Sequence, residues 1–369
     1  MKFEISREAI LKPLAQVAGV VERRQTLPVL SNVLMVVDGN QLSLTGTDLE
    51  VELVGRVMLE QAGESGDITV PARKLMDICK TLPEGAVIAF QLEEHKLVVT
   101  SGRSRFSLST LPAKEFPNVE SGQNSFEISL PQTVLRRLID RTSVAMAQQD
   151  VRYYLNGMLF ELEADKATVV TTDGHRLALC QAVVDIPVEE KIQVIVPRKG
   201  ILELGRLLSL DDETPVQLIF SSNHIQAVVG DMTFTSKLID GKFPDYRQVI
   251  PGKSQKQVLA ERDDLKQVLS RVAILSNEKY RGVRLILNPG QLQVFANNPE
   301  QEEAEEMLPV HYEGEKLEIG FNVGYLLDVL SVTDAVNVRI ALGDANSSAL
   351  IEEVADKADS LYVVMPMRL

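Results

Sequence analysis

The chain of 369 residues has no tryptophan, only two cysteines and no long hydrophobic run. Two cysteines, Cys79 and Cys180, are too few for a disulfide framework and fit a reducing compartment. No apolar stretch approaches the ~20 residues that a membrane helix needs, and the N-terminal residues lack the hydrophobic region of a secretory signal. We therefore expect a cytoplasmic protein without a membrane segment.

The motifs of several enzyme classes are also missing. The chain contains no HExxH zinc motif, no GxGxxG dinucleotide motif, no GxxxxGK[ST] phosphate loop, no CxxC pair and no nucleophile elbow. We therefore expect no metal, no cofactor and no catalytic residue.

What the chain does have is a threefold internal repeat. Phe3 and Phe126 occupy equivalent places 123 residues apart, and Asp48, Asp173 and Asn297 follow one another at 125 and 124 residues. Repeats of this length are domain-sized, because about 120 residues can enclose a hydrophobic core. We predict three similar domains, with boundaries at residues 1–122, 123–253 and 254–369.

Two kinds of segment alternate within each repeat. Some have the 3.6-residue period of an amphipathic helix, and others alternate apolar and polar residues as strands do. Pro13 fits poorly, because an interior proline should kink the first helix. We expect two helices and about eight short strands per repeat, an α+β fold in which helices pack on antiparallel sheets. The predicted helices cover residues 7–19, 72–81, 132–145, 198–209, 263–275 and 323–331.

Charge is divided unevenly between these segments. The formal net charge of −14 by itself argues against nucleic-acid binding. The predicted helices, however, carry 13 lysines and arginines against seven acids, so the rest of the chain is strongly acidic. Good helix propensity of lysine and arginine would explain this excess without a function, but glutamate is equally favourable and occurs there only twice. The pattern favours a helical face that attracts a polyanion.

Throughout its length the chain resembles the beta subunits of bacterial DNA polymerase III, the replication sliding clamps. The resemblance is carried in all three repeats by stretches such as TLPVLSNVL, SGRSRFSLSTLPAKEFPN, TTDGHRLA, FTSKLIDGKFPDYR, ILSNEKYRGVRL and YVVMPMRL. It implies three clamp domains per chain and a head-to-tail homodimer that closes into a six-domain ring with helices lining the hole. Closure of this kind suits similar units whose two ends are complementary.

The resemblance implies a non-catalytic processivity factor. Such a ring encircles double-stranded DNA without sequence preference. It tethers the DNA polymerase III core, the clamp loader, other polymerases and repair proteins through short linear motifs.

Candidate DNA contacts combine the basic helix residues with positions implied by the resemblance. Basic side chains would contact phosphates, and two adjacent tyrosines would stack on or hydrogen-bond an exposed single strand. Ordinary strand propensity would also account for the tyrosines. The predicted DNA-binding residues are Arg24, Arg73, Arg137, Gln149, Tyr153, Tyr154, Arg198 and Lys199.

The stretch Thr172–Leu177 contains Asp173 and His175, which are common acid–base residues. Because Thr47-Asp48 and Asn297-Asn298 hold the same place in the other repeats, a structural polar turn is the simpler interpretation. A phosphate-handling hydrolase that uses Asp173 and His175 is the alternative function. A three-domain scaffold that binds no DNA is a third, which the charge of the helices disfavours.

In the family, this stretch instead forms one wall of a hydrophobic pocket that captures a short peptide between the second and third domains. Apolar walls suit an anchor side chain, and methionine adapts to varied ligands. Gln248 and Asn346 stand where a basic and an apolar residue are expected, which leaves the peptide preference open. The implied pocket residues are Arg152, Leu155, Thr172, Gly174, His175, Arg176, Leu177, Pro244, Arg247, Val249, Ser348, Val363, Val364, Met365, Pro366, Met367 and Arg368.

The resemblance also implies a dimer contact between the first and third repeats. An acidic run such as EQEEAEE is usually a solvated face. Here, basic residues of the first repeat would meet acids of the third, as head-to-tail closure requires. The implied interface residues are Lys74, Arg103, Arg105, Phe106 and Leu108 in the first repeat, and Ile274, Leu275, Glu300, Glu302, Glu303, Glu305 and Glu306 in the third.

Overall fold

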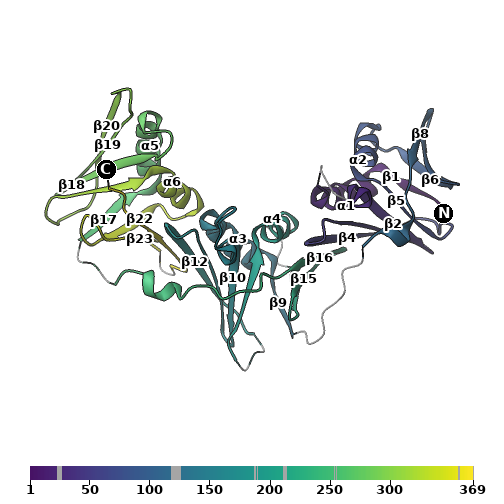
Figure 1. Cartoon of the computed structure of the whole chain (residues 1–369), viewed down its shortest axis with the longest axis horizontal. Coiled ribbons are helices and arrows are strands. Elements are labelled where there is room, and N and C mark those ends of the chain that lie inside the picture. The colour runs from purple at the N-terminus through teal and green to yellow at the C-terminus, as the bar shows by residue number, and fades with distance from the viewer. Residues whose placement is uncertain are drawn as a thin grey trace. The chain divides into compact units, whose positions relative to one another are not determined.

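The computed structural model describes residues 1–22, 27–117, 126–186, 188, 190–210, 214–252, 254, 256–355 and 358–368. The chain divides into two compact units, the first made of residues 1–135 and 199–238 and the second of residues 136–198 and 239–369. Within the described ranges each sequence repeat contributes two α-helices and eight strands, as predicted (Figure 1).

The six α-helices follow the predicted ranges closely. They are α1 (Arg7–Val20), α2 (Ala72–Thr81), α3 (Gln132–Thr142), α4 (Arg198–Leu207), α5 (Arg262–Val272) and α6 (Val323–Val332). Two predicted helices, which end at residues 145 and 275, are three residues shorter as α-helices in the structure. Their last three residues form the 3-10 turns η3 (Ser143–Ala145) and η6 (Ala273–Leu275). Among the described residues, no helix has both the length and the apolar character needed to cross a membrane.

The first unit is built on two antiparallel sheets. Its strands are β1 (Lys2–Ser6), β2 (Asn32–Asp38), β3 (Gln41–Thr47), β4 (Val51–Met58), β5 (Gly66–Pro71), β6 (Val87–Glu93), β7 (Lys96–Ser101), β8 (Ser104–Ser109), β9 (Phe126–Pro131), β14 (Pro215–Phe220), β15 (His224–Val229) and β16 (Met232–Lys237). The four-stranded sheet has the order β1-β6-β7-β8, and the eight-stranded sheet the order β5-β2-β3-β4-β16-β15-β14-β9. Since β4 pairs with β16, one sheet joins strands of the first two repeats.

Helix α1 packs on β3 and β4 of this eight-stranded sheet. Its first turn is capped by Ser6, whose Oγ accepts a hydrogen bond from the N–H of Ala9 at 3.3 Å. The helix continues through Pro13, where the sequence predicted a kink. A Cβ at Gly55 of β4 would lie only 3.1 Å from Cβ of Pro13, so glycine leaves the room that the proline ring fills.

The second unit repeats this plan. Its strands are β10 (Gly157–Glu163), β11 (Lys166–Thr172), β12 (Arg176–Val183), β13 (Ile192–Pro197), β17 (Lys256–Glu261), β18 (Gly282–Asn288), β19 (Gln291–Asn297), β20 (Glu303–Pro309), β21 (Leu317–Asn322), β22 (Asn337–Leu342), β23 (Ala349–Glu353) and β24 (Ser360–Val364). The eight-stranded sheet has the order β13-β10-β11-β12-β24-β23-β22-β17, and the four-stranded sheet the order β20-β19-β18-β21.

Strands β10, β11 and β12 are buried on both faces. On one face, Leu159, Leu177 and Val363 form a small apolar cluster with Phe243 and Tyr246. The last two residues belong to the segment that leads from the second repeat into the third. This segment therefore covers the sheet at the junction of β12 and β24, where the candidate site lies.

Candidate functional site

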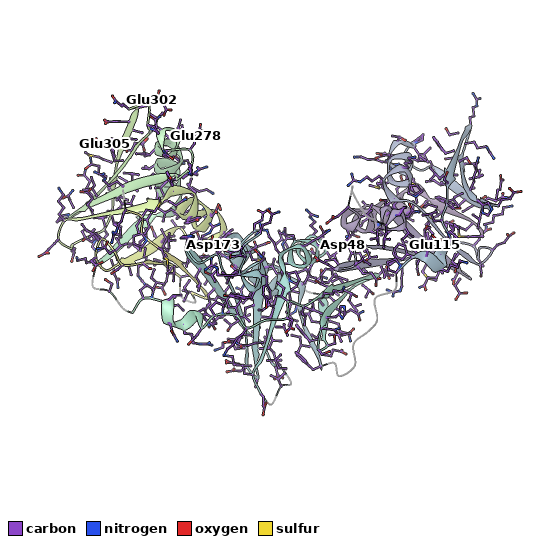
Figure 2. The ribbon with its side chains drawn as sticks, viewed as in Figure 1. Asp48, Glu115, Asp173, Glu278, Glu302 and Glu305 are labelled. Carbon is purple, nitrogen blue, oxygen red and sulfur yellow. The ribbon has the colours of Figure 1, made fainter. Side chains whose placement is uncertain are left out.

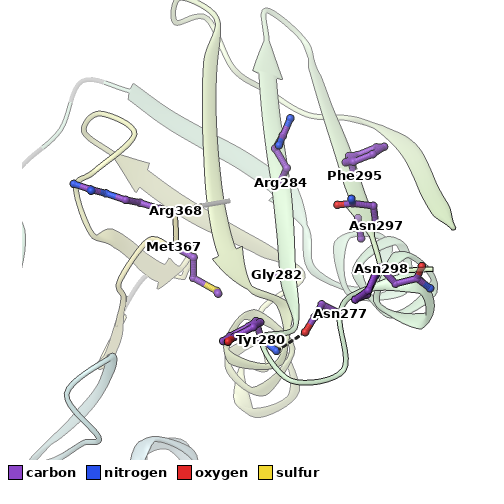
Figure 3. A pocket seen from close by; sticks show the side chains of 11 residues that line it. Asn277, Tyr280, Gly282, Arg284, Phe295, Asn297, Asn298, Met367 and Arg368 are labelled. Atoms are coloured by element: carbon purple, nitrogen blue, oxygen red, sulfur yellow. Dashed lines mark hydrogen bonds between the residues drawn. The ribbon is translucent and has the colours of Figure 1, made fainter. Parts of the chain in front are cut away.

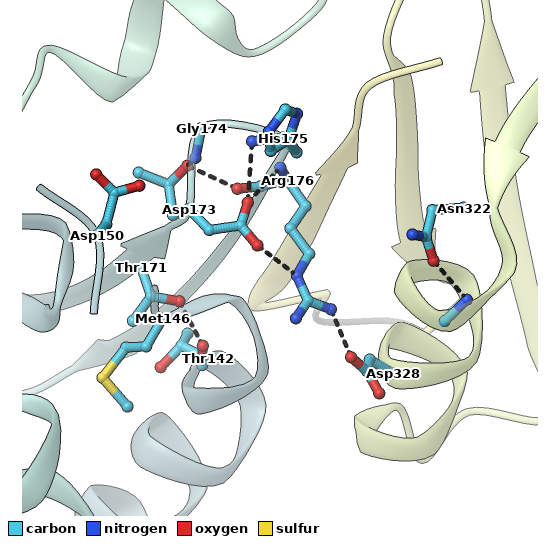
Figure 4. A network of polar contacts seen from close by, with 12 residues as sticks. Thr142, Met146, Asp150, Thr171, Asp173, Gly174, His175, Arg176, Asn322 and Asp328 are labelled. Atoms are coloured by element: carbon cyan, nitrogen blue, oxygen red, sulfur yellow. Dashed lines mark hydrogen bonds and ion pairs between the residues drawn. The ribbon is translucent and has the colours of Figure 1, made fainter. Parts of the chain in front are cut away.

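The stretch Thr172–Arg176 is the turn between β11 and β12. Asp173 Oδ1 accepts hydrogen bonds from the backbone N–H groups of His175 at 2.9 Å and Arg176 at 3.0 Å (Figure 4). Gly174 takes a positive φ of 88°. Such a turn uses the carboxylate to satisfy backbone donors, so the prediction of a structural polar turn is confirmed.

The same turn tethers Arg176. Its Nε donates to Asp173 Oδ2 at 3.1 Å, and its Nη1 donates to Asp328 Oδ2 of α6 at 2.5 Å (Figure 4). The guanidinium also lies over the ring of Tyr325, 4.3 Å from its centroid. Both oxygens of Asp173 are thus engaged by structural partners, which leaves the alternative hydrolase without a free carboxylate in this turn.

Beside the turn is a cavity of about 180 Å³, which we call the pocket. Leu155, Leu177 and Val363 are almost fully buried and provide apolar surface to it, whereas Val249 and Met365 are 45% and 40% exposed. A deep apolar base with an accessible apolar rim suits the capture of one or two hydrophobic side chains. The pocket is lined by Arg152, Leu155, Thr172, Gly174, His175, Arg176, Leu177, Pro244, Asp245, Tyr246, Val249, Val363 and Met365.

Eleven of the seventeen predicted pocket residues are therefore brought together around one cavity. Asp245 and Tyr246 were missed, although both belong to the FTSKLIDGKFPDYR stretch that carries the resemblance. The backbone N–H of Met365 donates to the carbonyl oxygen of His175 at 2.9 Å and holds the C-terminal segment against the turn.

Six predicted pocket residues lie elsewhere. Val364 is fully buried in the core of the third repeat, because consecutive residues of β24 point to opposite faces and Val363 takes the pocket side. Arg247 turns away from the pocket and binds the carboxylate of Glu161. Ser348 and Pro366 are also absent from the lining.

The other two, Met367 and Arg368, lie on the third repeat beside Arg284. They line a separate cavity of about 510 Å³ (Figure 3). The N–H of Met367 donates to the carbonyl oxygen of Gly320 at 2.8 Å, which carries the segment away from the pocket onto the edge strand β21. Asn346, one of the two departures from the family pattern, lines a third cavity next to Arg368. The other, Gln248, donates to Asp245 Oδ2 at 3.0 Å.

Arg152 closes one side of the pocket. Its guanidinium donates to both carboxylate oxygens of Asp150, which lowers the pKa of that carboxyl to about 2. It also donates to the carbonyl oxygen of Asp173 at 3.1 Å. A Cβ at Gly174 would lie 2.8 Å from Arg152 Nη1, so the close approach of this guanidinium requires glycine at the turn.

The predicted tyrosines lie next to the pocket in η4 (Tyr153–Leu155) and not in a strand. Leu155 of this turn points into the pocket, and Tyr153 is 56% exposed. The two tyrosine rings meet edge to face, with centroids 5.7 Å apart. Gln149 precedes them with a positive φ of 57° and is exposed.

The predicted basic contacts differ in their exposure and in whether another group of the chain already binds them. Arg24 lies outside the described residues. Arg73 is exposed, and Arg137 is exposed but pairs with Asp359 at 2.8 Å. Arg198 is half-buried and donates to the carbonyl oxygen of Met146 at 3.2 Å.

Lys199 differs from a free surface lysine. Its Nζ contacts Glu22 Oε1 at 2.6 Å and also binds Asp48. Burial lowers the pKa of this amine, but the hydrogen bonds to Asp48 and Glu22 outweigh burial, so its pKa is raised. Two acids therefore already neutralise Lys199, which weakens the prediction that it serves as a direct phosphate contact.

The predicted dimer residues lie around two edge strands, β8 in the first unit and β20 in the second. Ile274 is 76% exposed, and Leu275 and Phe106 are half-buried. Leu108 is only 7% exposed, because it faces the interior of its own unit. The remaining basic residues, Lys74, Arg103 and Arg105, are exposed.

Five acids surround the other edge strand. Glu302 and Glu305 stand at the surface of the third repeat (Figure 2), and Glu300 and Glu303 are also exposed. Glu306 already forms an ion pair within its own chain, because Arg271 of α5 donates to both of its carboxylate oxygens, at 2.5 and 2.7 Å.

Three family models together match almost the whole chain. They are described as the N-terminal, central and C-terminal domains of the DNA polymerase III beta subunit and match residues 1–120, 129–245 and 247–368. The beta sliding clamp of Pseudomonas putida is 64% identical over 369 residues, and that of Escherichia coli strain K12 is 56% identical over 372 residues, both with complete coverage of the two chains.

Solved structures are similar over the same length. A DNA polymerase sliding clamp from Pseudomonas aeruginosa with a ligand matches with a TM-score of 0.96 and 63% identity, covering all of both chains. A second structure from that organism, bound to griselimycin, has the same TM-score and 64% identity, again with complete coverage.

Proposed function

Because the chain belongs to the family of DNA polymerase III beta subunits, the beta sliding clamps, we propose that two copies close into a ring around duplex DNA and tether partners through the pocket. The family is one of processivity factors and not of enzymes, and the chain is a sliding clamp of three clamp domains.

Ring closure is supported by the two free sheet edges. Strands β8 and β20 each end a four-stranded sheet and present unpaired backbone N–H and C=O groups. If β8 of one copy met β20 of another, the exposed Arg103 and Arg105 would lie opposite acids such as Glu303 and Glu305. Rim charges of this kind mainly fix orientation, whereas Ile274, Leu275 and Phe106 would supply apolar contact.

DNA contact would come from basic helix residues and would not depend on sequence, because phosphates carry no base information. Arg73 is exposed, while Arg137 and Lys199 would have to exchange a carboxylate for a phosphate. Tyr153 offers an exposed ring for a single-stranded base.

The pocket carries the partner proposal. Its apolar base and accessible rim fit the hydrophobic anchors of a short linear motif, in the manner of other peptide grooves. The DNA polymerase III core, the clamp loader, other polymerases and repair proteins are the expected owners of such motifs, and the cytoplasm is the expected compartment.

The experiment that tests the whole proposal uses DNA topology. The protein is loaded onto nicked circular DNA by a clamp loader, and the DNA is then linearised. We expect retention on the circle at a salt concentration that abolishes direct binding, and release after linearisation, because a closed ring leaves only over a free end. Equal retention on circular and linear DNA would overturn the proposed encirclement.

A further inference from the structure

We propose that Glu161, which lies behind the pocket and not in its lining, is a positioning residue that fixes the pocket wall formed by Tyr246. The proposal rests on the proposed peptide-binding function of the pocket. It starts from an unusual group, a carboxylate whose side chain is fully buried in the middle of a sheet.

Glu161 is surrounded by donors. Its carboxylate accepts hydrogen bonds from the hydroxyl of Tyr246 at 3.0 Å, from Nε2 of Gln193 at 2.7 Å and from the guanidinium of Arg247. The amine of Lys191 approaches Oε2 to 2.7 Å. Burial raises the pKa of this carboxyl, but these four donors together lower it to about 2. The group is therefore ionised throughout the physiological pH range.

The sheet itself does not need this charge. Thr168 and Gln193 stand directly beside Glu161 on the two adjacent strands, but the next positions on the face that carries the pocket are apolar, as at Leu159, Val170 and Leu179. A carboxylate buried among them is favourable only if donors replace the water that it loses. Two of its donors, Tyr246 and Arg247, come from η5 (Tyr246–Val249), the segment that crosses this face. The buried charge thus selects one position of that segment.

Tyr246 connects the charge to the pocket. The residue is 4% exposed and lines the cavity, while its hydroxyl reaches back to Glu161. Arg247 is held by the same carboxylate, and its guanidinium lies over the Tyr246 ring at 4.5 Å from the centroid. Pro244 and Val249 flank these residues and also line the pocket. One carboxylate therefore sets the depth of the ring and the course of the wall on both sides.

The test measures, by fluorescence anisotropy, the affinity of the full-length protein for a labelled peptide of the QLxLF type, the motif that the family resemblance implies. Glu161→Ala should weaken binding about tenfold, because the Tyr246 hydroxyl loses its acceptor and the Arg247 guanidinium loses its carboxylate partner. Glu161→Gln, which keeps an oxygen for the tyrosine hydroxyl, should weaken it less, and Tyr246→Phe should weaken it about threefold. Glu163→Gln is the matched control, since Glu163 lies on the same strand and pairs with Lys166 and Lys191, whereas the Tyr246 hydroxyl donates to Glu161.

A double-mutant cycle separates positioning from general destabilisation. If Glu161 acts through the tyrosine hydroxyl, adding Tyr246→Phe to Glu161→Ala should weaken binding no further. Fully additive losses, or wild-type affinity in both Tyr246→Phe and Glu161→Gln, would overturn the positioning role. If the wild-type protein and the Glu163→Gln control also failed to bind the peptide, the proposed function of the pocket would be wrong instead. Should Glu161→Ala not fold, the Gln and Phe variants still decide the question.

Discussion

Two turns of the same design have different surroundings in this molecule. Residues Thr47–Val51 of the first repeat and Thr172–Arg176 of the second are equivalent in sequence, and Asp48 accepts two backbone N–H groups as Asp173 does. The second turn has Gly174 under a guanidinium and borders the pocket. The first has Leu49, which is 38% exposed, at the equivalent place.

The difference between the turns extends along the strands that follow them. The pocket base Leu177 corresponds to Glu52 of the first repeat, and Asp48 holds Lys199 where Asp173 holds Arg176. The repeat thus conserves the turn as a structural unit, while single substitutions around it decide whether a hydrophobic site can form. Function here resides in the neighbours of a repeated scaffold.

The largest loss of peptide binding is expected from deleting the C-terminal residues that lie beside the second turn. Deleting Met365–Leu369 removes the rim residue Met365 and its hydrogen bond to His175. Peptide binding should be abolished. The dimer mass measured by light scattering should stay unchanged, because the predicted dimer interface lies at other residues. Full peptide affinity in a truncated dimer would mean that the pocket is assigned wrongly.

A swap between the turns should have the next largest effect. Gly174→Leu places a side chain where Arg152 Nη1 lies and forces a non-glycine residue to φ 88°. We expect peptide affinity to fall at least about tenfold with the fold retained. The reverse change, Leu49→Gly, is the control, since Leu49 already has φ 79° and should tolerate glycine. Equal peptide affinity in wild type and Gly174→Leu would show that the tight packing under Arg152 does not shape the pocket.

How far the sequence predicts these features depends on whether they are local. The helices were predicted to within a turn, because their periodicity and caps lie in consecutive residues. The predicted pocket residues that belong to the turn do line the cavity. Val364 does not, and strand alternation would have indicated this from the sequence. Tyr246 lines the cavity without having been predicted, because its place depends on a segment that crosses a distant strand. No local pattern indicates that Lys199 is already paired with two acids.

The pairing of Lys199 with Asp48 and Glu22 predicts a smaller effect, a change in DNA affinity. Asp48→Asn removes one of the two acids that neutralise Lys199, while an amide oxygen can still support the turn. Direct binding to duplex DNA at low salt should strengthen about twofold to threefold if Lys199 lies on the DNA-facing side. The equivalent change Asp173→Asn should leave DNA binding unaltered, and filter binding across a salt series compares the two. Unchanged DNA affinity in Asp48→Asn would remove Lys199 from the DNA contacts.

The smallest effect concerns Glu52, the counterpart of the pocket base. Burial raises the pKa of its carboxyl to about 7. Since the folded state holds this proton more tightly than the unfolded state, stability is highest at low pH and falls as pH rises from the unfolded pKa toward 7. Glu52→Gln should therefore raise the melting temperature at pH 8 by roughly 2–4 °C, the equivalent of about 1 kcal/mol, and should have little effect at pH 4.

A Glu161→Gln variant should show the opposite trend, because the pKa of Glu161 is lowered to about 2. The stabilising contribution of its carboxylate is present above the unfolded pKa and is lost as the pH falls toward 2. Parallel pH profiles for the two variants would contradict the contrast between an unpaired and a fully paired carboxylate at these two positions.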